Sequence, residues 1–219
     1  MIPDHINEIT LDSLLPRVFA REELPSSEVW RRKVSFRRGG RYLVESASGG
    51  GKSSLAAFIM GARRDYEGRI LFDGIDASSL GIADWQELRR SHIAYLPQEL
   101  ALFPELSAID NILLKGEICG ELDLRRVEAW MDRLGITARR DFPAGKLSIG
   151  QQQRVALVRS LCQPFDFILL DEPVSHLDEA NNRTAACIVE EEAARQGAGI
   201  ITFSVGNPLL IDNPEKLNL

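Results

Sequence analysis

The stretch ESASGGGKSS, residues 45–54, brings three consecutive glycines, a lysine and two serines together. It follows a strand predicted for residues 41–45 and precedes a helix predicted for residues 53–61. A glycine-rich turn between a strand and a helix points backbone N–H groups at an anion, and the missing Cβ lets phosphate come close. A lysine at this position reaches nucleotide phosphates, and the hydroxyl that follows it can bind Mg²⁺. The stretch therefore predicts a nucleotide phosphate loop.

One position departs from the pattern G-x-x-x-x-G-K-[ST]. Ser46 stands where the first glycine is expected. If that residue takes a left-handed backbone conformation, a serine there costs about 1–2 kcal/mol. Taken alone, the stretch is compatible with a nucleotide site and also with a flexible loop that binds nothing.

The composition sets the class of protein. The chain has 219 residues, of which 44% are hydrophobic, and a formal net charge of −6. This is enough apolar material for one well-cored domain, and the negative charge argues against nucleic-acid binding by bulk charge. The basic run at residues 30–33 reads as a solvated strand or turn. The three cysteines form no CxxC pair, which argues against a zinc site or a disulfide framework. No apolar run approaches the roughly 18 residues of a membrane span, so a membrane role is expected to need a partner.

Strands and helices alternate along most of the chain. Residues 1–40 read as short strands and turns, and the middle of the chain is helical. Further strands are predicted at residues 67–74, 93–97, 165–170 and 199–203, and further helices at residues 108–119, 124–134, 149–163 and 179–196. Ser107 and Asp123 are expected to cap the first two of these helices, and Leu124, Val127, Met131 and Leu134 are expected to share one apolar face. This alternation predicts an α/β fold with a parallel sheet, in which residues 199–203 form the last strand.

Four more stretches follow the glycine loop in a fixed order. They are AYLPQ at residues 94–98, LSIGQQQR at 147–154, FDFILLDEP at 165–173 and SHLD at 175–178. In this order and spacing they resemble the ATP-binding cassette (ABC) ATPases over nearly the whole chain. LSIGQQQR resembles the signature loop LSGGQ, with Ile149 at its most permissive position. The other stretches resemble the Q-loop, the Walker B strand and the D-loop of that family.

The resemblance implies a fold and a domain organisation. It implies a P-loop NTPase (RecA-like) α/β core with a small antiparallel β subdomain and an inserted helical subdomain. The whole chain, residues 1–219, is expected to form one ABC ATPase domain. Residues 1–99 would hold the β subdomain and the Walker A part of the core, residues 100–146 the helical subdomain, and residues 147–219 the signature helix, Walker B strand, D-loop and last core strand.

The resemblance also implies a site for ATP and Mg²⁺. Glu172 is expected to polarise the attacking water as general base, a role typically worth 10²–10⁴-fold, with Gln98 and Ser204 as further catalytic residues. The expected ligands of Mg²⁺ are Ser53, Gln98 and Asp171. The expected nucleotide contacts are Phe19, Ser46, Ala47, Ser48, Gly49, Gly50, Gly51, Lys52, Ser53, Ser54, Ser148, Gly150, Gln151 and Asp178. For the adenine, Trp30 is the second candidate, and a core role for Phe19 stays open. Gln152 and Gln153 read as a polar helix face.

One family feature is missing. Members normally carry a histidine at the end of the last core strand, in contact with the γ-phosphate. The chain has three histidines, His5, His92 and His176, and none lies beyond residue 176. Ser204 occupies the place of that histidine, and its hydroxyl is shorter and carries no charge. His176 reads as a surface loop residue, with a place at a dimer interface as the alternative.

The resemblance implies the ATPase subunit of an ABC transporter. Two such subunits, identical or different, would dimerise head to tail and drive separate transmembrane permease subunits. The subunit would therefore be cytoplasmic, at the inner face of the cell membrane. Leu102, Phe103 and Pro104 could line the docking groove or pack inside the helical subdomain. A weakly catalytic nucleotide switch is the alternative function. A DNA-repair or translation cassette and a metabolite kinase fit less well, and no nucleic-acid partner is expected.

Overall fold

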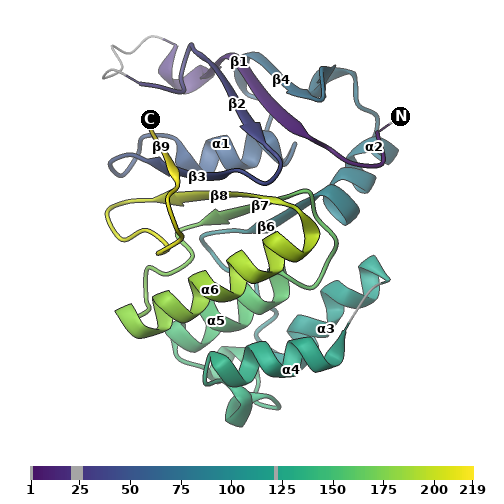
Figure 1. The fold of residues 1–219 in the computed structure, drawn as a ribbon, viewed down its shortest axis with the longest axis vertical. Coiled ribbons are helices and arrows are strands. Elements are labelled where there is room, and N and C mark those ends of the chain that lie inside the picture. Colours follow the sequence, from purple (N-terminus) through teal and green to yellow (C-terminus); the bar gives the residue numbers. More distant parts are fainter. Residues whose placement is uncertain (1, 21–26, 121–122) are drawn as a thin grey trace.

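The computed structural model describes residues 2–20, 27–120 and 123–219, which fold around two β-sheets (Figure 1). The larger sheet has five strands in the order β6-β7-β8-β3-β9, and every neighbouring pair is parallel. The smaller sheet has four strands in the order β2-β1-β4-β5 and is antiparallel. The strands are β1 Glu8–Pro16, β2 Lys33–Arg37, β3 Arg41–Glu45, β4 Tyr66–Phe72, β5 Ile75–Asp76, β6 Ile93–Leu96, β7 Phe167–Asp171, β8 Gly199–Ser204 and β9 Glu215–Asn218. The helices are α1 Lys52–Ile59, α2 Ile82–Glu87, α3 Ala108–Cys119, α4 Leu124–Arg133, α5 Ile149–Ser160 and α6 Glu179–Gln196.

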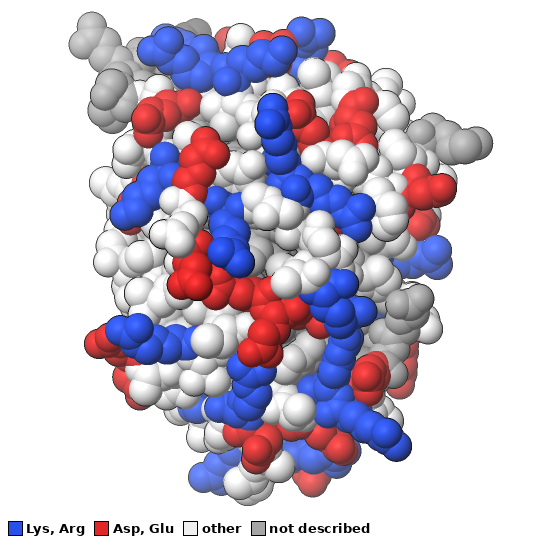
Figure 2. All heavy atoms as spheres, viewed as in Figure 1, with Lys and Arg blue, Asp and Glu red and all other residues white. Residues whose placement is uncertain are grey.

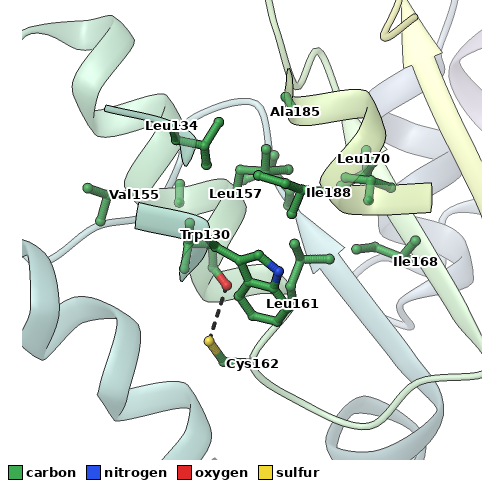
Figure 3. Close-up of a cluster of buried hydrophobic side chains, with 14 of the residues drawn as sticks. Trp130, Leu134, Val155, Leu157, Leu161, Cys162, Ile168, Leu170, Ala185 and Ile188 are labelled. Atoms are coloured by element: carbon green, nitrogen blue, oxygen red, sulfur yellow. Dashed lines mark hydrogen bonds between the residues drawn. The ribbon is translucent and has the colours of Figure 1, made fainter. Parts of the chain in front are cut away.

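The buried strand β7 explains the layering. Its side chains alternate between the two faces of the sheet. Ile168 and Leu170 pack into a core shared with α5 and α6 (Figure 3), whereas Phe167 and Leu169 pack into a core shared with α1 and the smaller sheet. Figure 1 shows α1 between the two sheets and α5 and α6 on the opposite face of the larger sheet. An apolar run of this kind is expected where a parallel strand is covered on both faces.

The strand order places the carboxyl ends of β3, β8 and β7 side by side. Glu45 at the end of β3 pairs with Ser204, and Asp171 at the end of β7 pairs with Phe203. The chain then leaves β3 into the glycine loop and leaves β7 through Glu172. Ligands of open parallel sheets bind at this edge of the strands. The topology therefore brings residues 46–54, 171–172 and 204 to one place.

The two helices of the middle region begin where the sequence predicts. The Ser107 side chain caps α3 and the Asp123 side chain caps α4. The predicted apolar face of α4 is wrong in one residue, because Leu124 is 51% exposed. Trp130 is buried on that helix instead, and it packs into the core shown in Figure 3. Leu124 lies in the first turn of α4, at the end of the helix, whereas Trp130 lies one turn from its other end.

The last strand of the sheet differs from the prediction. Strand β9 follows β8 in the chain and adds a fifth strand beside β3. Its sequence, EKLN, has no apolar run, and only Leu217 is buried. An edge strand of this composition gives no hydrophobic signal, which is why the sequence predicted residues 199–203 as the end of the sheet.

The surface carries charges of both signs. Figure 2 shows Lys and Arg interspersed with Asp and Glu over the viewed face, without one dominant basic area on that face. Within the described residues, no helix combines the length and the apolar character needed to cross a bilayer.

Candidate functional site

The glycine loop starts helix α1 in the way a phosphate loop requires. Gly49 and Gly51 have φ values of +86° and +94°, a region that side chains with a Cβ avoid, and Gly51 caps the helix. Ser46 is not among the described residues with positive φ. The strain considered for a serine at this position is therefore wrong. The backbone does not need glycine there, so the departure from the motif leaves the loop intact.

Lys52 is held inside the loop by three oxygens. Its Nζ donates to the carbonyl of Ser46 at 2.9 Å, to the hydroxyl of Ser46 at 2.9 Å and to the carbonyl of Ala47 at 3.1 Å. An ammonium group has three donors, so all of them are occupied. The side chain is 6% exposed, and burial lowers the pKa of Lys52 below its ordinary value, which the nearby charge of Glu172 partly offsets. Phosphate oxygens would have to replace at least one of these acceptors.

Three side chains form an oxygen-rich group at the start of α1. The Ser53 hydroxyl donates to Oε1 of Gln98 at 3.4 Å, and both residues are exposed. Asp171 is 1% exposed, and neither carboxylate oxygen has a hydrogen-bond partner. Burial raises the pKa of Asp171, and the neighbouring hydroxyl of Ser53 and the charge of Lys52 partly lower it. Buried polar groups are normally paired, and Mg²⁺ prefers carboxylate, carbonyl and hydroxyl oxygens, so this donor set fits that ion.

Glu172 and Ser204 also carry unpaired polar atoms at the carboxyl edge of the larger sheet. Glu172 has a φ of +51°, which for a residue with a Cβ costs on the order of 1–3 kcal/mol. Its Oε1 is buried without a partner, and burial raises the pKa of Glu172, partly offset by Lys52. Ser204 is fully buried, and its Oγ likewise has no partner. Unpaired buried groups and backbone strain concentrate at functional sites, which makes this edge the candidate site.

Two aromatic residues lie against the loop. A Cβ added to Gly51 would come within 3.0 Å of the Phe19 ring and 2.9 Å of the Trp30 ring. Trp30 is 3% exposed, and its Nε1–H donates to the carbonyl of Gly50 at 3.3 Å, so the prediction of a fully solvated basic run at residues 30–33 is wrong for Trp30. Phe19 is only half-buried. The geometry therefore leaves Phe19 as the ring with a free surface beside the loop.

The signature stretch lies on the other side of the sheet. Ser148 caps α5, and the side chain of Gln151 accepts in return from the Ser148 N–H. Asp178 caps α6 by accepting from the Asn181 N–H. Helices α5 and α6, which begin after Ser148 and Asp178, cover the face of the larger sheet opposite to α1 (Figure 1). The structure thus gathers the phosphate-loop residues, Gln98, Asp171, Glu172 and Ser204, and leaves this second group apart.

The histidines do not fill the place of Ser204. His5 and His92 both contact Asp166, through Nδ1 atoms at 2.9 and 2.6 Å from its carboxylate, at the amino end of β7. His176 is exposed, and its Nδ1 lies 2.9 Å from the Ser175 hydroxyl. The first two therefore lie at the edge of the sheet away from Ser204.

Gln153 is the polar residue that sequence reasoning missed. Its placement on a polar face is wrong, since the residue is 1% exposed and donates to the backbone carbonyl of Glu172 at 2.8 Å. One signal was available in the sequence. Gln153 precedes Leu157 and Leu161 by four and eight residues, and these two leucines are buried. That spacing places all three on the inner face of α5.

Three comparisons place the chain among known proteins. The family described as ABC transporter matches residues 31–175. The macrolide export ATP-binding/permease protein MacB of Shewanella sp. (strain ANA-3) is 33% identical over 171 residues, covering 77% of this chain and 26% of that protein. The lipoprotein-releasing system ATP-binding protein LolD of Novosphingobium aromaticivorans is 36% identical over 147 residues, covering 66% of this chain and 64% of that protein.

The fold comparison agrees with the sequence comparison. The dimeric structure of MJ0796, a bacterial ABC transporter cassette, superposes with a TM-score of 0.75 at 23% identity, covering 90% of this chain and 87% of that one. At this level of sequence identity the superposition shows only that the two chains share a fold, that of a P-loop NTPase cassette. The chain spans about a quarter of the length of MacB, 26% of it, so it corresponds to one part of that relative. The family match, which spans more than half of the chain, shows that this protein is an ATP-binding cassette of the ABC transporter family.

Proposed function

We propose that the chain binds Mg²⁺-ATP at the carboxyl edge of the larger sheet and hydrolyses it to drive a transport complex. The observation that carries this proposal is the set of unpaired buried polar atoms at that edge. Both oxygens of Asp171, one oxygen of Glu172 and the hydroxyl of Ser204 lack partners, and the charge of Lys52 lies close to both carboxylates. A triphosphate and a cation at this edge would supply partners for these groups.

Each residue would have one task in hydrolysis. The N–H groups of residues 47–53 and the ammonium of Lys52 would hold the β- and γ-phosphates. Ser53, Gln98 and Asp171 would hold Mg²⁺, which when bound bridges the phosphates and neutralises their charge. Glu172 would take a proton from the attacking water, and its raised pKa suits a base working near neutral pH. Ser204 would donate one hydrogen bond to the γ-phosphate, and Phe19 would stack on the adenine.

A second subunit would complete the site. Ser148, Gly150, Gln151 and Asp178 lie at the starts of α5 and α6, helices on the face of the larger sheet opposite to α1. The exposed start of α5 offers N–H groups and a hydroxyl that suit a phosphate. A head-to-tail dimer would bring these groups to the γ-phosphate bound by the other subunit. Nucleotide would then lie between two chains and join them.

The membrane partner would dock on the helical region beside Gln98. Leu102 packs partly against the core, whereas Phe103 is 50% exposed and Pro104 is also exposed. Leu102 therefore serves packing, and Phe103 and Pro104 are the residues free to contact permease subunits at the cytoplasmic side of the membrane. The relatives MacB and LolD are named for export and for lipoprotein release. The corresponding role for this chain would be to drive separate permease subunits that move a substrate.

The test is ATP turnover by the purified chain with Mg²⁺, beside Glu172→Gln. We expect turnover in the wild type, a loss of about 100-fold or more in Glu172→Gln, and unchanged ATP affinity, because the amide cannot accept the proton. Glu128→Gln makes the same chemical change on the exposed face of α4 and is the matched control. Equal turnover in wild type and Glu172→Gln would contradict the proposal.

A nucleotide switch without transport is the second candidate. Ser204 in the place of the family histidine favours it, because a serine cannot carry positive charge toward the γ-phosphate. For a switch we expect ATP to bind and dimerise the chain while wild type and Glu172→Gln both show no turnover, with or without membrane subunits. Turnover stimulated by membrane subunits would decide for the transport reading.

A further inference from the structure

Gln153 connects the start of α5 to the loop that carries the catalytic carboxylate. Its side-chain Nε2 donates to the carbonyl of Glu172 at 2.8 Å and to the hydroxyl of Ser175 at 3.1 Å. Its Oε1 accepts from the backbone N–H of His176 at 3.0 Å. The side chain therefore uses both ends of its amide on one short segment, residues 172–176.

The backbone of Glu172 needs support of this kind. Its φ of +51° lies in a region that residues with a Cβ rarely adopt, so the surroundings must fix it. The N–H of Glu172 donates to the carbonyl of Phe203 at 3.0 Å, which holds one side of the residue to strand β8. The carbonyl on the other side is held by Gln153, with a longer contact of 3.4 Å from the Ser175 N–H. These contacts fix the peptide groups on both sides of Glu172, and with them the direction of its Cα–Cβ bond, while the backbone N–H of Val205 hydrogen-bonds the carboxylate itself.

The same segment is packed against the first turn of α5. A Cβ added to Gly150 would lie 2.9 Å from the carbonyl oxygen of His176, so only glycine allows this approach. Residues 148–151 of that turn are the ones proposed to meet the partner's nucleotide. A shift of the turn would therefore move Gln153 and the segment it holds. Gln153 thus connects the first turn of α5, which would meet the nucleotide of the partner subunit, to Glu172, the proposed general base for the nucleotide of its own chain.

We propose that Gln153 is a positioning residue that sets the direction of the Glu172 carboxylate and couples it to the first turn of α5. This inference rests on the proposed ATPase function. The hydrogen bonds of the Gln153 side chain go to the carbonyl of Glu172, the hydroxyl of Ser175 and the N–H of His176, so it acts through this segment. Loss of its amide should lower the rate of the chemical step and leave nucleotide binding in place.

The experiment uses Gln153→Met, which keeps the length of the side chain and removes both hydrogen-bonding ends. We expect kcat to fall on the order of 10- to 100-fold, as misplacement of a catalytic group does, with ATP affinity changed less than about twofold. Gln163→Met is the matched control. Gln163 is 3% exposed and its Nε2 donates to the carbonyls of Arg89 and Ile93 at the opposite edge of the sheet. It should lose stability to a similar degree and keep its kcat.

A double variant separates positioning from general damage. In a Glu172→Gln background, adding Gln153→Met should leave the residual turnover unchanged, because there is no base left to aim. Should Gln153→Met fail to fold, Gln153→Glu keeps the acceptor for His176 and loses the donor to Glu172, and the same loss of kcat is expected. If wild-type kcat is retained in Gln153→Met, or if the losses multiply in the double variant, the inference is overturned while the ATPase function stands. Equal turnover in wild type and Glu172→Gln would overturn both.

Discussion

Replacing Ser46 with alanine should strengthen ATP binding, although the position belongs to the phosphate loop. The Ser46 hydroxyl lies 2.9 Å from Nζ of Lys52 and is one of three acceptors that occupy the ammonium. Binding of phosphate must displace at least one of them. Ser46→Ala removes the side-chain acceptor in advance, and it leaves the two carbonyl acceptors of the loop in place.

The size of the effect follows from the strength of one hydrogen bond to a charged group. Such a bond contributes about 1.5–3 kcal/mol to stability, and here the same ammonium keeps two other acceptors, so we take about 1–1.5 kcal/mol. The substitution lowers the stability of the free protein by this free energy, but it does not lower the stability of the ATP complex, in which the hydrogen bond is already displaced. The dissociation constant for ATP should then fall by about fivefold to twelvefold. The melting temperature of the free protein should fall by about 2–6 °C, since 1 kcal/mol corresponds to roughly 2–4 °C at this chain length.

Two measurements on the same samples decide the matter. Calorimetric titration with ATP gives the affinity, and thermal unfolding with and without nucleotide gives the stability. Opposite signs are expected: a lower melting temperature without ATP and a larger rise on adding it. Ser46→Gly should follow Ser46→Ala in affinity, but should lose about 0.5–1 kcal/mol more stability through backbone freedom. Weaker ATP binding in Ser46→Ala would show that the hydroxyl contacts phosphate and would refute the reasoning.

Two further predictions concern the unpaired carboxylate and the close approach of α5. Asp171→Asn should raise the melting temperature of the free protein, since it replaces a buried charge by a neutral amide of the same shape, and should weaken the dependence of ATP affinity on Mg²⁺. Burial raises the pKa of Asp171 in the folded protein, so the protonated carboxyl stabilises the fold fully below about pH 4, and this stabilisation is lost as the pH rises through the pKa of the folded state. The difference in melting temperature between Asp171→Asn and wild type should therefore grow from about pH 4 to about pH 8. A constant difference would contradict this assignment. Gly150→Ala places a Cβ 2.9 Å from the carbonyl oxygen of His176, so turnover should fall by tenfold or more; full turnover in this variant would show that the segment can move aside.

Sequence patterns predict most of the scaffold because the patterns are local. The helix at residues 179–196 is confirmed to the residue, with Asp178 as its cap and Gly197 in the left-handed conformation behind it. The strands around residues 41–45 and 93–97 are likewise confirmed. Each of these elements has a cap, a glycine or an apolar run within its own few residues. Strand β9 has none of these, because it is fixed by pairing with β3 along an edge.

The site could be predicted in its residue types and less well in its contacts. The motif names Lys52 and Ser46, but the capture of the lysine by the serine hydroxyl depends on how the loop closes. The hydrogen bond from Gln153 to the carbonyl of Glu172 connects residues that are nineteen positions apart in the chain. The fold brings together the two elements on which they lie. A single sequence contains no signal for such a contact beyond the helical spacing that buries Gln153. Contacts between motifs are therefore where the structure adds most.

The same groups that make the site useful make the empty protein less stable. Asp171, Glu172 and Ser204 hold buried polar atoms without partners, and Glu172 adds backbone strain. A ligand that pairs these atoms binds only the folded state, so its binding free energy adds to the stability of the fold. The structure therefore predicts a protein whose melting temperature depends strongly on nucleotide and Mg²⁺ together. Because the partner's first turn of α5 would supply the remaining hydrogen bonds to the γ-phosphate, the stabilisation by ATP should also increase with protein concentration.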